Sequence, residues 1–260
     1  MHHLLKMAED CQNAAPSSLQ VSPRIPILYF GDFERFRESR LRIVTVALNP
    51  SLSEFPTASP FQRFPSLCGY SRCNGNVLGL QQAYNDYFKV DPYMRWFNHF
   101  EKVLNGFDAS FFCSNDYENT ALHTDLLSPV ATNPTWSKLN DNDKNSMSKS
   151  GLDLWHSLMN FLNPDVLIVS VARKYFDQIR FLRSQQSVEI FSVQGKGRKR
   201  VTVCSMEISK KKRVNVIYAI PAQVPFGYLS HTEKKDVGAC FSEYVRKYSI
   251  AVKSKPHGEL

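Results

Sequence analysis

A short apolar segment that ends in asparagine and proline constrains the fold more than any other part of the chain. Residues 42–48 read Arg-Ile-Val-Thr-Val-Ala-Leu, and this excess of β-branched residues predicts a buried strand. Pro50 removes a backbone donor and fixes φ, so the strand must end with Asn49 at its tip. Open α/β sheets place their ligand sites at the carboxyl ends of such strands.

Strands and helices alternate along the rest of the chain. Apolar stretches predict further strands at residues 119–127, 165–171 and 214–220, with a short edge strand at 25–30. Helical patterns fall at residues 32–40, 77–88, 92–104, 146–162, 173–183 and 230–248. This alternation predicts an α/β fold of three layers, in which helices cover both faces of a mostly parallel central sheet of about four strands.

We expect a single domain over residues 25–250. A chain of 260 residues with 43% hydrophobic content can bury one sizeable core. Residues 1–24 are polar and interrupted by prolines, which predicts a loose N-terminal leader, and residues 251–260 form a C-terminal tail. Residues 52–76 are rich in proline and glycine, and they predict a long loop whose aromatic side chains favour a functional role.

A basic hairpin is predicted over residues 188–208, inserted before the last strand. Its cations and those just after it include Lys196, Arg198, Lys199, Arg200, Lys211 and Lys212. Together with a formal net charge of +8, these residues favour contact with the phosphates of a nucleic acid. A solvated turn without a ligand is the alternative interpretation of the same charges.

The residue types argue against several other kinds of site. Six scattered cysteines lack the two-residue spacing of zinc or redox motifs, so we expect reduced thiols in a cytoplasmic protein with no metal and no cofactor. No apolar run reaches the length of a membrane span, so we expect no membrane partner. The strand ends carry no nucleophile elbow, no glycine-rich phosphate loop and no compact carboxylate cluster of the kind a metal-dependent nuclease needs.

The segment Ala47-Leu48-Asn49-Pro50-Ser51 resembles the first motif of the uracil-DNA glycosylase superfamily, a strand ending in Gly-x-Asn/Asp-Pro. The later order is similar too: a loop with aromatic residues, a second strand with a polar residue that reads the base, a third apolar strand, and a last strand leading to a histidine. The resemblance covers the layout of residues 40–248. It implies a monofunctional DNA glycosylase that hydrolyses an N-glycosidic bond and leaves an abasic site in double- or single-stranded DNA, and we expect a monomer.

The resemblance also implies catalytic roles for two residues. Asn49 would hold and orient the hydrolytic water, and His231 would stabilise the departing base anion or grip a phosphate. The chain departs from the superfamily at both motifs. Ala47 replaces the usual glycine, and residues 221–227 do not read as the usual His-Pro-Ser motif.

Further residues are implied to contact the base and the DNA. Asp125 lies where many members carry a base-reading asparagine, and His123 shares its face of the strand. Phe61 or Phe64 would stack on the flipped base. The wedge that fills the gap left in the duplex would be Phe226, Tyr228 and Leu229.

Asp125 directs the expected substrate toward cytosine. An ionised aspartate only accepts hydrogen bonds, and it pairs naturally with the exocyclic amine of cytosine. Excision of ordinary cytosine would be toxic, so we expect a modified cytosine, such as glucosylated 5-hydroxymethylcytosine of phage DNA, and a role in antiviral defence.

Several alternatives stay open at this point. The chain could instead be a repair glycosylase for uracil or a damaged base, or a nucleic-acid-binding protein without catalysis on the same fold. Asn49 could merely brace a turn, and Asp125 could cap a loop or pair with an arginine. Ser230 and Glu233 have the spacing of a capping box, which would make His231 a surface residue in the first turn of the last helix. Phe61 and Phe64 could be ordinary core residues.

Overall fold

The computed structural model describes residues 1–68, 77–113, 116–183, 187–193, 199–209, 212–221 and 223–253. Its strands are β1 (Ile43–Ala47), β2 (Ala109–Ser110), β3 (Asn119–Asp125), β4 (Val166–Val169), β5 (Leu182–Arg183), β6 (Val188–Val193), β7 (Lys199–Ser209) and β8 (Lys212–Tyr218). Its α-helices are α1 (His2–Ala14), α2 (Phe33–Glu38), α3 (Val77–Val90), α4 (Met94–Asn105), α5 (Asp141–Leu162), α6 (Arg173–Phe176) and α7 (His231–Lys253). Single-turn 3-10 helices include η1 (Leu52–Glu54), η2 (Pro65–Leu67) and η4 (Trp136–Lys138).

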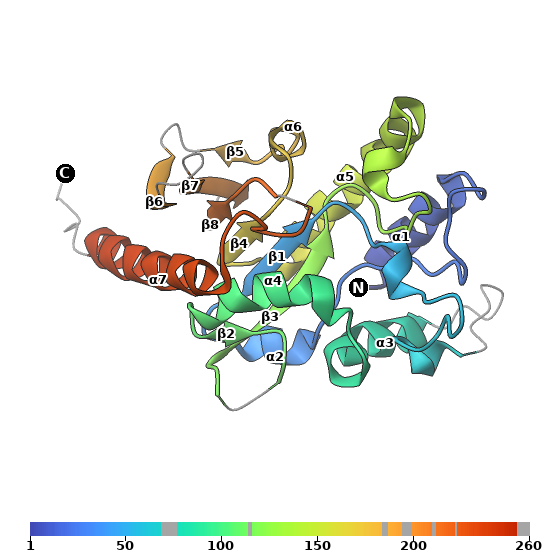
Figure 1. The fold of residues 1–260 in the computed structure, drawn as a ribbon, viewed down its shortest axis with the longest axis horizontal. Helices are drawn as coiled ribbons and strands as arrows, with labels where there is room; N and C mark the ends of the chain where they lie inside the picture. The colour runs from blue at the N-terminus through green and yellow to red at the C-terminus, as the bar shows by residue number, and fades with distance from the viewer. Residues whose placement is uncertain are drawn as a thin grey trace, which may run out of the picture.

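One sheet runs through the molecule in the order β2-β3-β1-β4-β8-β7-β5, and β6 pairs with β7 (Figure 1). The neighbours from β2 to β8 pair in parallel, whereas β7 is antiparallel to β8, β6 and β5. The predicted α/β class with a mostly parallel sheet is therefore confirmed. Within the described residues the sheet has eight strands, more than the four that were predicted.

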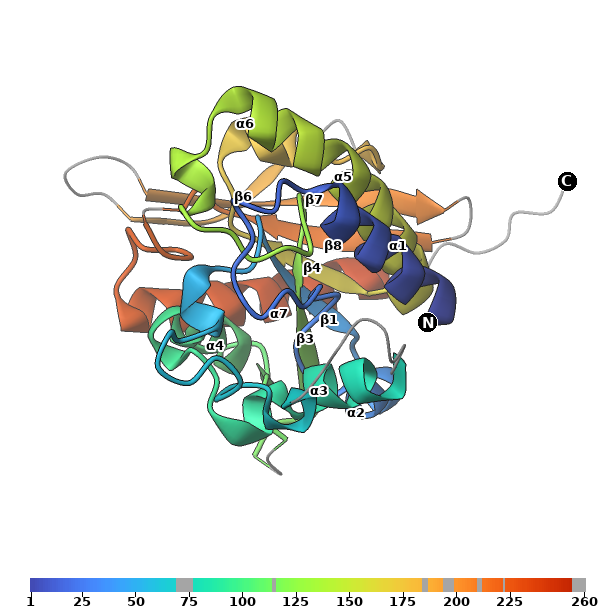
Figure 2. The same cartoon turned by 90° about the vertical axis from the view of Figure 1, so that its right-hand side faces the viewer.

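Helices cover both faces of the parallel strands. On one face α4 packs beside α7, and on the other α5 packs on the sheet with α1 outside it (Figures 1 and 2). Neighbouring residues of β3 show the two faces directly, because side chains alternate along a strand. The ring of His123 lies 5.1 Å from that of Phe97 in α4, whereas the hydroxyl of Thr124 accepts a hydrogen bond of 3.1 Å from Trp155 in α5.

The order of the central strands defines a switch point. From β1 the chain passes first to β2 and β3 on one side and later to β4 on the other, so β1 and β4 lie side by side with connections that leave in opposite directions. Both strands are buried along their whole length. Ligands of doubly wound sheets bind at the carboxyl ends of such a strand pair. Asn49 follows β1 there, and Ser170 follows β4.

The prediction of a loose leader over residues 1–24 is wrong. Helix α1 occupies residues 2–14 and packs along α5. Its buried residues Leu4, Leu5, Ala8 and Cys11 follow a helical spacing and form one apolar stripe. Polar residues on the opposite face hid this amphipathic pattern, since they lower the average hydropathy of the segment.

The region after β4 also differs from its prediction. The helix expected over residues 173–183 ends after one turn, at Phe176, because Leu182 and Arg183 pair with β7 as the short strand β5. The basic hairpin is built from β6 and β7, but β7 also pairs with β8 from Thr202 to Ser209. The hairpin therefore precedes the last strand, as predicted, and extends the central sheet.

Two smaller differences concern the ends of predicted elements. Residues 25–30, which were expected to form a strand, make a single β-bridge between Phe30 and His123 but no continuous strand. Helix α7 continues past the predicted domain end at residue 250 to Lys253, and residues 254–260 of the predicted tail lie outside the described residues.

Candidate functional site

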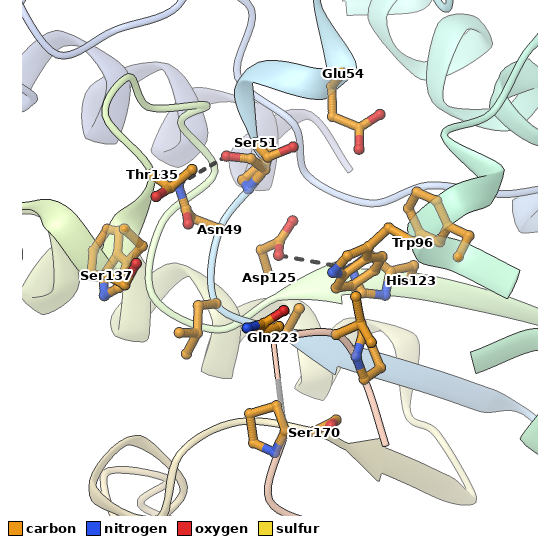
Figure 3. A pocket seen from close by; sticks show the side chains of 18 of the residues that line it. Asn49, Ser51, Glu54, Trp96, His123, Asp125, Thr135, Ser137, Ser170 and Gln223 are labelled. Atoms are coloured by element: carbon orange, nitrogen blue, oxygen red, sulfur yellow. Dashed lines mark hydrogen bonds and ion pairs between the residues drawn. The ribbon is translucent and has the colours of Figure 1, made fainter. Parts of the chain in front are cut away.

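A cavity of about 250 Å³ lies at the switch point. This volume is slightly below the 300–1,000 Å³ typical of sites for drug-sized ligands, so it suits one small ring. The lining residues come from the ends of β1, β3 and β4, from η1 and α4, and from the loops before α2, α5 and α7 (Figure 3). Its polar side chains are Asn49, Ser51, Glu54, His123, Asp125, Thr135, Ser137, Ser170 and Gln223.

Asn49 is held rigidly at the end of β1. Its amide nitrogen Nδ2 lies 2.9 Å from the carbonyl oxygen of Pro50, 3.2 Å from that of Val130 and 3.0 Å from the hydroxyl of Thr132. Carbonyl oxygens only accept hydrogen bonds, so they fix which end of the amide is the nitrogen. The oxygen Oδ1 has no hydrogen-bond partner among the described residues, so it remains available as an acceptor in the cavity.

His123 and Asp125 lie on the same face of β3, as predicted from strand alternation. The Nε2 atom of His123 is 3.8 Å from Oδ1 of Asp125, which is within ion-pair distance but too long for a hydrogen bond. Both side chains are buried. Burial raises the pKa of Asp125, and the nearby His123 opposes that rise. Asp125 is therefore a desolvated carboxyl group at the floor of the cavity.

The ring of His123 is enclosed by aromatic side chains. The rings of Phe30, Trp96, Phe97 and Phe100 have centroids 5.1–5.8 Å from that of His123. Its Nδ1 atom lies 2.7 Å from the hydroxyl of Thr45 in β1. This packing fixes the position of the imidazole, which is a close neighbour of the Asp125 carboxyl group.

Sequence reasoning missed Glu54, a second buried carboxyl group that lines the cavity. Figure 3 shows its carboxyl group pointing toward Asp125. Burial raises the pKa of Glu54 to about 8, although a hydrogen bond from the hydroxyl of Tyr87 and the charge of Arg63 oppose the rise. One sequence signal could have found it, because Glu54 is the only charged residue between Arg42 and Arg63.

The aromatic wall of the cavity is not the one that was predicted. Phe64 is fully buried and stacks on Phe55 with ring centroids 5.3 Å apart, and Phe61 packs partly buried against the core. Neither lines the cavity. The 3-10 turns after Pro50 direct this segment into the core, and the wall comes instead from Phe30, Trp96, Phe97 and Trp136.

The structure does not bring His231 to Asn49. His231 is exposed in the first turn of α7, where Ser230 and Glu233 form the predicted capping box with hydrogen bonds of 2.6 and 3.2 Å. Its ring lies 6.2 Å from that of His99, whose Nδ1 atom is 2.7 Å from Nζ of the buried Lys234. This cluster lies apart from the lining of the cavity.

The predicted wedge is packed into the protein. Phe226 and Leu229 are buried, so neither can enter a duplex, and Phe226 adopts φ 52° while its amide donates a hydrogen bond of 3.2 Å to Ser170. Tyr228 is partly exposed, and its hydroxyl donates a hydrogen bond of 2.9 Å to the carbonyl oxygen of Arg200. Gln223, with φ 62°, is exposed and lines the cavity.

The predicted DNA-binding cations fall into two groups. Lys196, Arg198 and Lys211 lie outside the described residues, and of Lys199 only the backbone is described, as the start of β7. Arg200 is exposed and lies 3.5 Å from Glu189. Lys212 forms an ion pair with Asp165, which also binds Arg42. Lys212 is therefore engaged within the fold.

Two searches of the described residues gave negative results. No group of three or more His, Cys, Asp or Glu side chains in that part of the chain could hold a metal ion. No helix there is long and apolar enough to cross a membrane. Comparison of the sequence with protein-family models and with curated proteins gave no match.

Proposed function

We propose that this protein is a monofunctional DNA glycosylase. It hydrolyses the N-glycosidic bond of a flipped-out modified cytosine, such as glucosylated 5-hydroxymethylcytosine of phage DNA, and leaves an abasic site. The observation that carries this proposal is the rigid amide of Asn49, whose unpartnered oxygen shares a small cavity with the buried carboxyl group of Asp125. We place the activity in a cytoplasmic monomer acting in phage defence on double- or single-stranded DNA.

The fixed Asn49 amide suits this reaction because little general-base chemistry is required. Cleavage of an N-glycosidic bond passes through a cationic sugar, so a catalyst needs to place a water and stabilise separated charge. Oδ1 of Asn49 accepts a hydrogen bond from that water. Its position is set by three contacts of Nδ2, so it needs no reorganisation during the reaction.

The cavity supplies the contacts that a flipped base needs. Asp125 accepts a hydrogen bond from the exocyclic amine, which offsets the unfavourable burial of its charge. Phe30, Trp96 and Phe97 provide aromatic surface against which the ring packs. The volume of about 250 Å³ suits one flipped base.

Polar residues at the rim fit a sugar on the base. Thr135, Ser137 and Gln223 line the cavity, and all three are exposed to solvent (Figure 3). Hydroxyl and amide groups can donate and accept hydrogen bonds, which is the chemistry that sugar hydroxyls require. A glucosyl group attached at the 5-position would project from the ring toward such a rim.

The test is an excision assay with oligonucleotides that contain uracil, 5-hydroxymethylcytosine or its glucosylated form, in single and double strands. We expect alkali-labile abasic sites from a modified cytosine with the wild type and with Asn160→Ala, a control at an exposed asparagine of α5. Asn49→Ala should lose cleavage and keep DNA binding. Cleavage of uracil alone would overturn the cytosine assignment, and DNA binding without any cleavage would favour a non-catalytic nucleic-acid-binding protein.

A further inference from the structure

The cavity contains two buried carboxyl groups that face one another, a feature that water placement by Asn49 does not explain. Glu54 and Asp125 are each almost fully buried, and Figure 3 shows their carboxyl groups pointing toward each other. Two ionised carboxylates in one desolvated site repel each other, so one of them retains its proton. Identifying which one decides what the cavity can recognise.

The hydrogen bonds around Glu54 show which of its two oxygens is free to carry a proton. The backbone N–H of Tyr93 donates to the hydroxyl oxygen of Tyr87 at 3.0 Å, and the Tyr87 hydroxyl donates in turn to Oε2 of Glu54. Oε2 is thus an acceptor. The other oxygen, Oε1, has no hydrogen-bond partner among the described residues, and it is the atom left to carry a proton into the cavity.

Arg63, whose charge lowers the pKa of Glu54, makes no direct ion pair with it among the described residues. Arg63 donates from Nε to the carbonyl oxygen of Ser53 at 3.1 Å, and its Nη1 lies 3.1 Å from a carboxylate oxygen of Asp91. Its guanidinium group is therefore committed to these acceptors. Burial raises the pKa of Asp125 as well, but Asp125 has His123 at 3.8 Å, which opposes that rise and favours the ionised form.

We propose that Glu54 contacts the base as a neutral carboxylic acid, donating a hydrogen bond from Oε1 while Asp125 accepts one from the same base. The pair then reads an edge with one acceptor and one donor, such as the ring nitrogen and exocyclic amine of a cytosine-type base. This inference rests on the proposed glycosylase function and adds a second specificity-determining residue to its site.

A pH dependence follows from the groups that face Glu54. These are Tyr87 of α3, Arg63 between η1 and η2, and Asp125 of β3 with His123 beside it. With a pKa of about 8, Glu54 is neutral at pH 7 and ionises as the pH rises through 8. Ionisation removes the donor and adds a second negative charge beside Asp125. Excision must therefore fall on the alkaline side, mainly through KM.

The test compares excision by wild type, Glu54→Gln and Glu54→Leu between pH 6 and 9.5, with Glu38→Gln on the exposed side of α2 as the control. Glutamine donates through its NH2 group, accepts from Tyr87 and never ionises. We expect Glu54→Gln to keep wild-type excision at pH 7 within about threefold and to lose the alkaline fall, while Glu54→Leu loses on the order of 10-fold or more because the base acceptor is left unpaired. A folded but inactive Glu54→Gln, or one that keeps the alkaline fall, would overturn the inference.

A second readout separates this inference from the proposed function. If the wild type excises no base at any pH, the glycosylase proposal fails, and calorimetric binding of free 5-hydroxymethylcytosine base then judges Glu54. We expect wild-type affinity to fall about 10-fold per pH unit above 8 and that of Glu54→Gln to stay constant. Binding by the wild type that does not change with pH, or no binding at pH 7, would overturn the role of Glu54.

Discussion

Two regions of the molecule contain the residues that were predicted to be catalytic: the Asn49 corner at the end of β1 and the His231 corner at the start of α7. They differ in how their polar groups are used. At the Asn49 corner the backbone holds one end of the amide and leaves the other end without a partner beside a cavity. At the His231 corner, Ser230 and Glu233 satisfy the first turn of α7 and His231 lies exposed on the surface. A polar group that folding leaves unsatisfied is available to a ligand, whereas one that caps a helix is already used.

The largest difference expected between the corners concerns stability, because the cavity buries an acid. The pKa of Glu54 in the folded chain is about 8, above its ordinary value of 4.5, so the folded state binds its proton more tightly. This contribution to the free energy of unfolding is fully present below pH 4.5 and is lost as the pH rises through 8. The difference between these pKa values sets an upper limit of about 5 kcal/mol.

Urea unfolding at pH 5, 7 and 9 measures this effect in wild type and Glu54→Gln. The wild type should lose stability relative to the variant as the pH rises, and His231→Ala should follow the wild-type curve. Parallel curves for wild type and Glu54→Gln would show that Glu54 is not a desolvated acid, and the contrast between the corners would weaken.

The next largest effect separates the two corners in catalysis. Removal of one fixed group that stabilises charge typically lowers a rate by about 10²–10³-fold, so Asn49→Ala should lower single-turnover excision by that factor. His231→Ala should change it by less than about 10-fold, since the imidazole lies away from the cavity. Equal losses in the two variants would mean that DNA binding rearranges α7 and carries His231 into the site.

A smaller effect is expected at Asp125, because we propose that its side chain selects the base and takes no part in breaking the bond. Asp125→Asn adds a donor, so the ratio of kcat/KM for uracil to that for the modified cytosine should rise by about 10–100-fold, as expected for a hydrogen-bonded base contact of 1–3 kcal/mol. Asp141→Asn, at an exposed position of α5, is the control. An unchanged ratio would remove Asp125 from base recognition.

The features of the two corners that follow from local backbone rules could be predicted from the sequence. The apolar strand and Pro50 predicted where Asn49 lies, and strand alternation predicted that His123 and Asp125 share a face. The Ser230 capping box also formed as predicted, but it was the evidence against His231 as a catalyst. Local spacing therefore predicted positions correctly in both corners.

The contents of the cavity depended on long-range packing that no local pattern reveals. Phe64 and Trp96 are both aromatic residues near helical turns, yet Phe64 packs in the core and Trp96 lines the cavity. Glu54 is separated from Asp125 by 71 residues and meets it only because β1 and β3 pair in parallel register, with Ala47 opposite Asp125. Short strands such as β5 have too few residues for any periodic signal.

The smallest expected effect tests whether the His231 corner is structural. Ser230→Ala removes the side chain that accepts from the Glu233 amide, and loss of an N-cap typically lowers the free energy of unfolding by about 1 kcal/mol. Excision should stay within about twofold of wild type, because the cavity does not include α7. Thr232→Ala, one residue into the helix and exposed, is the matched control and should change neither quantity. A large loss of excision with unchanged stability would contradict the assignment, since it would show that the start of α7 takes part in the reaction and that both corners act on the substrate.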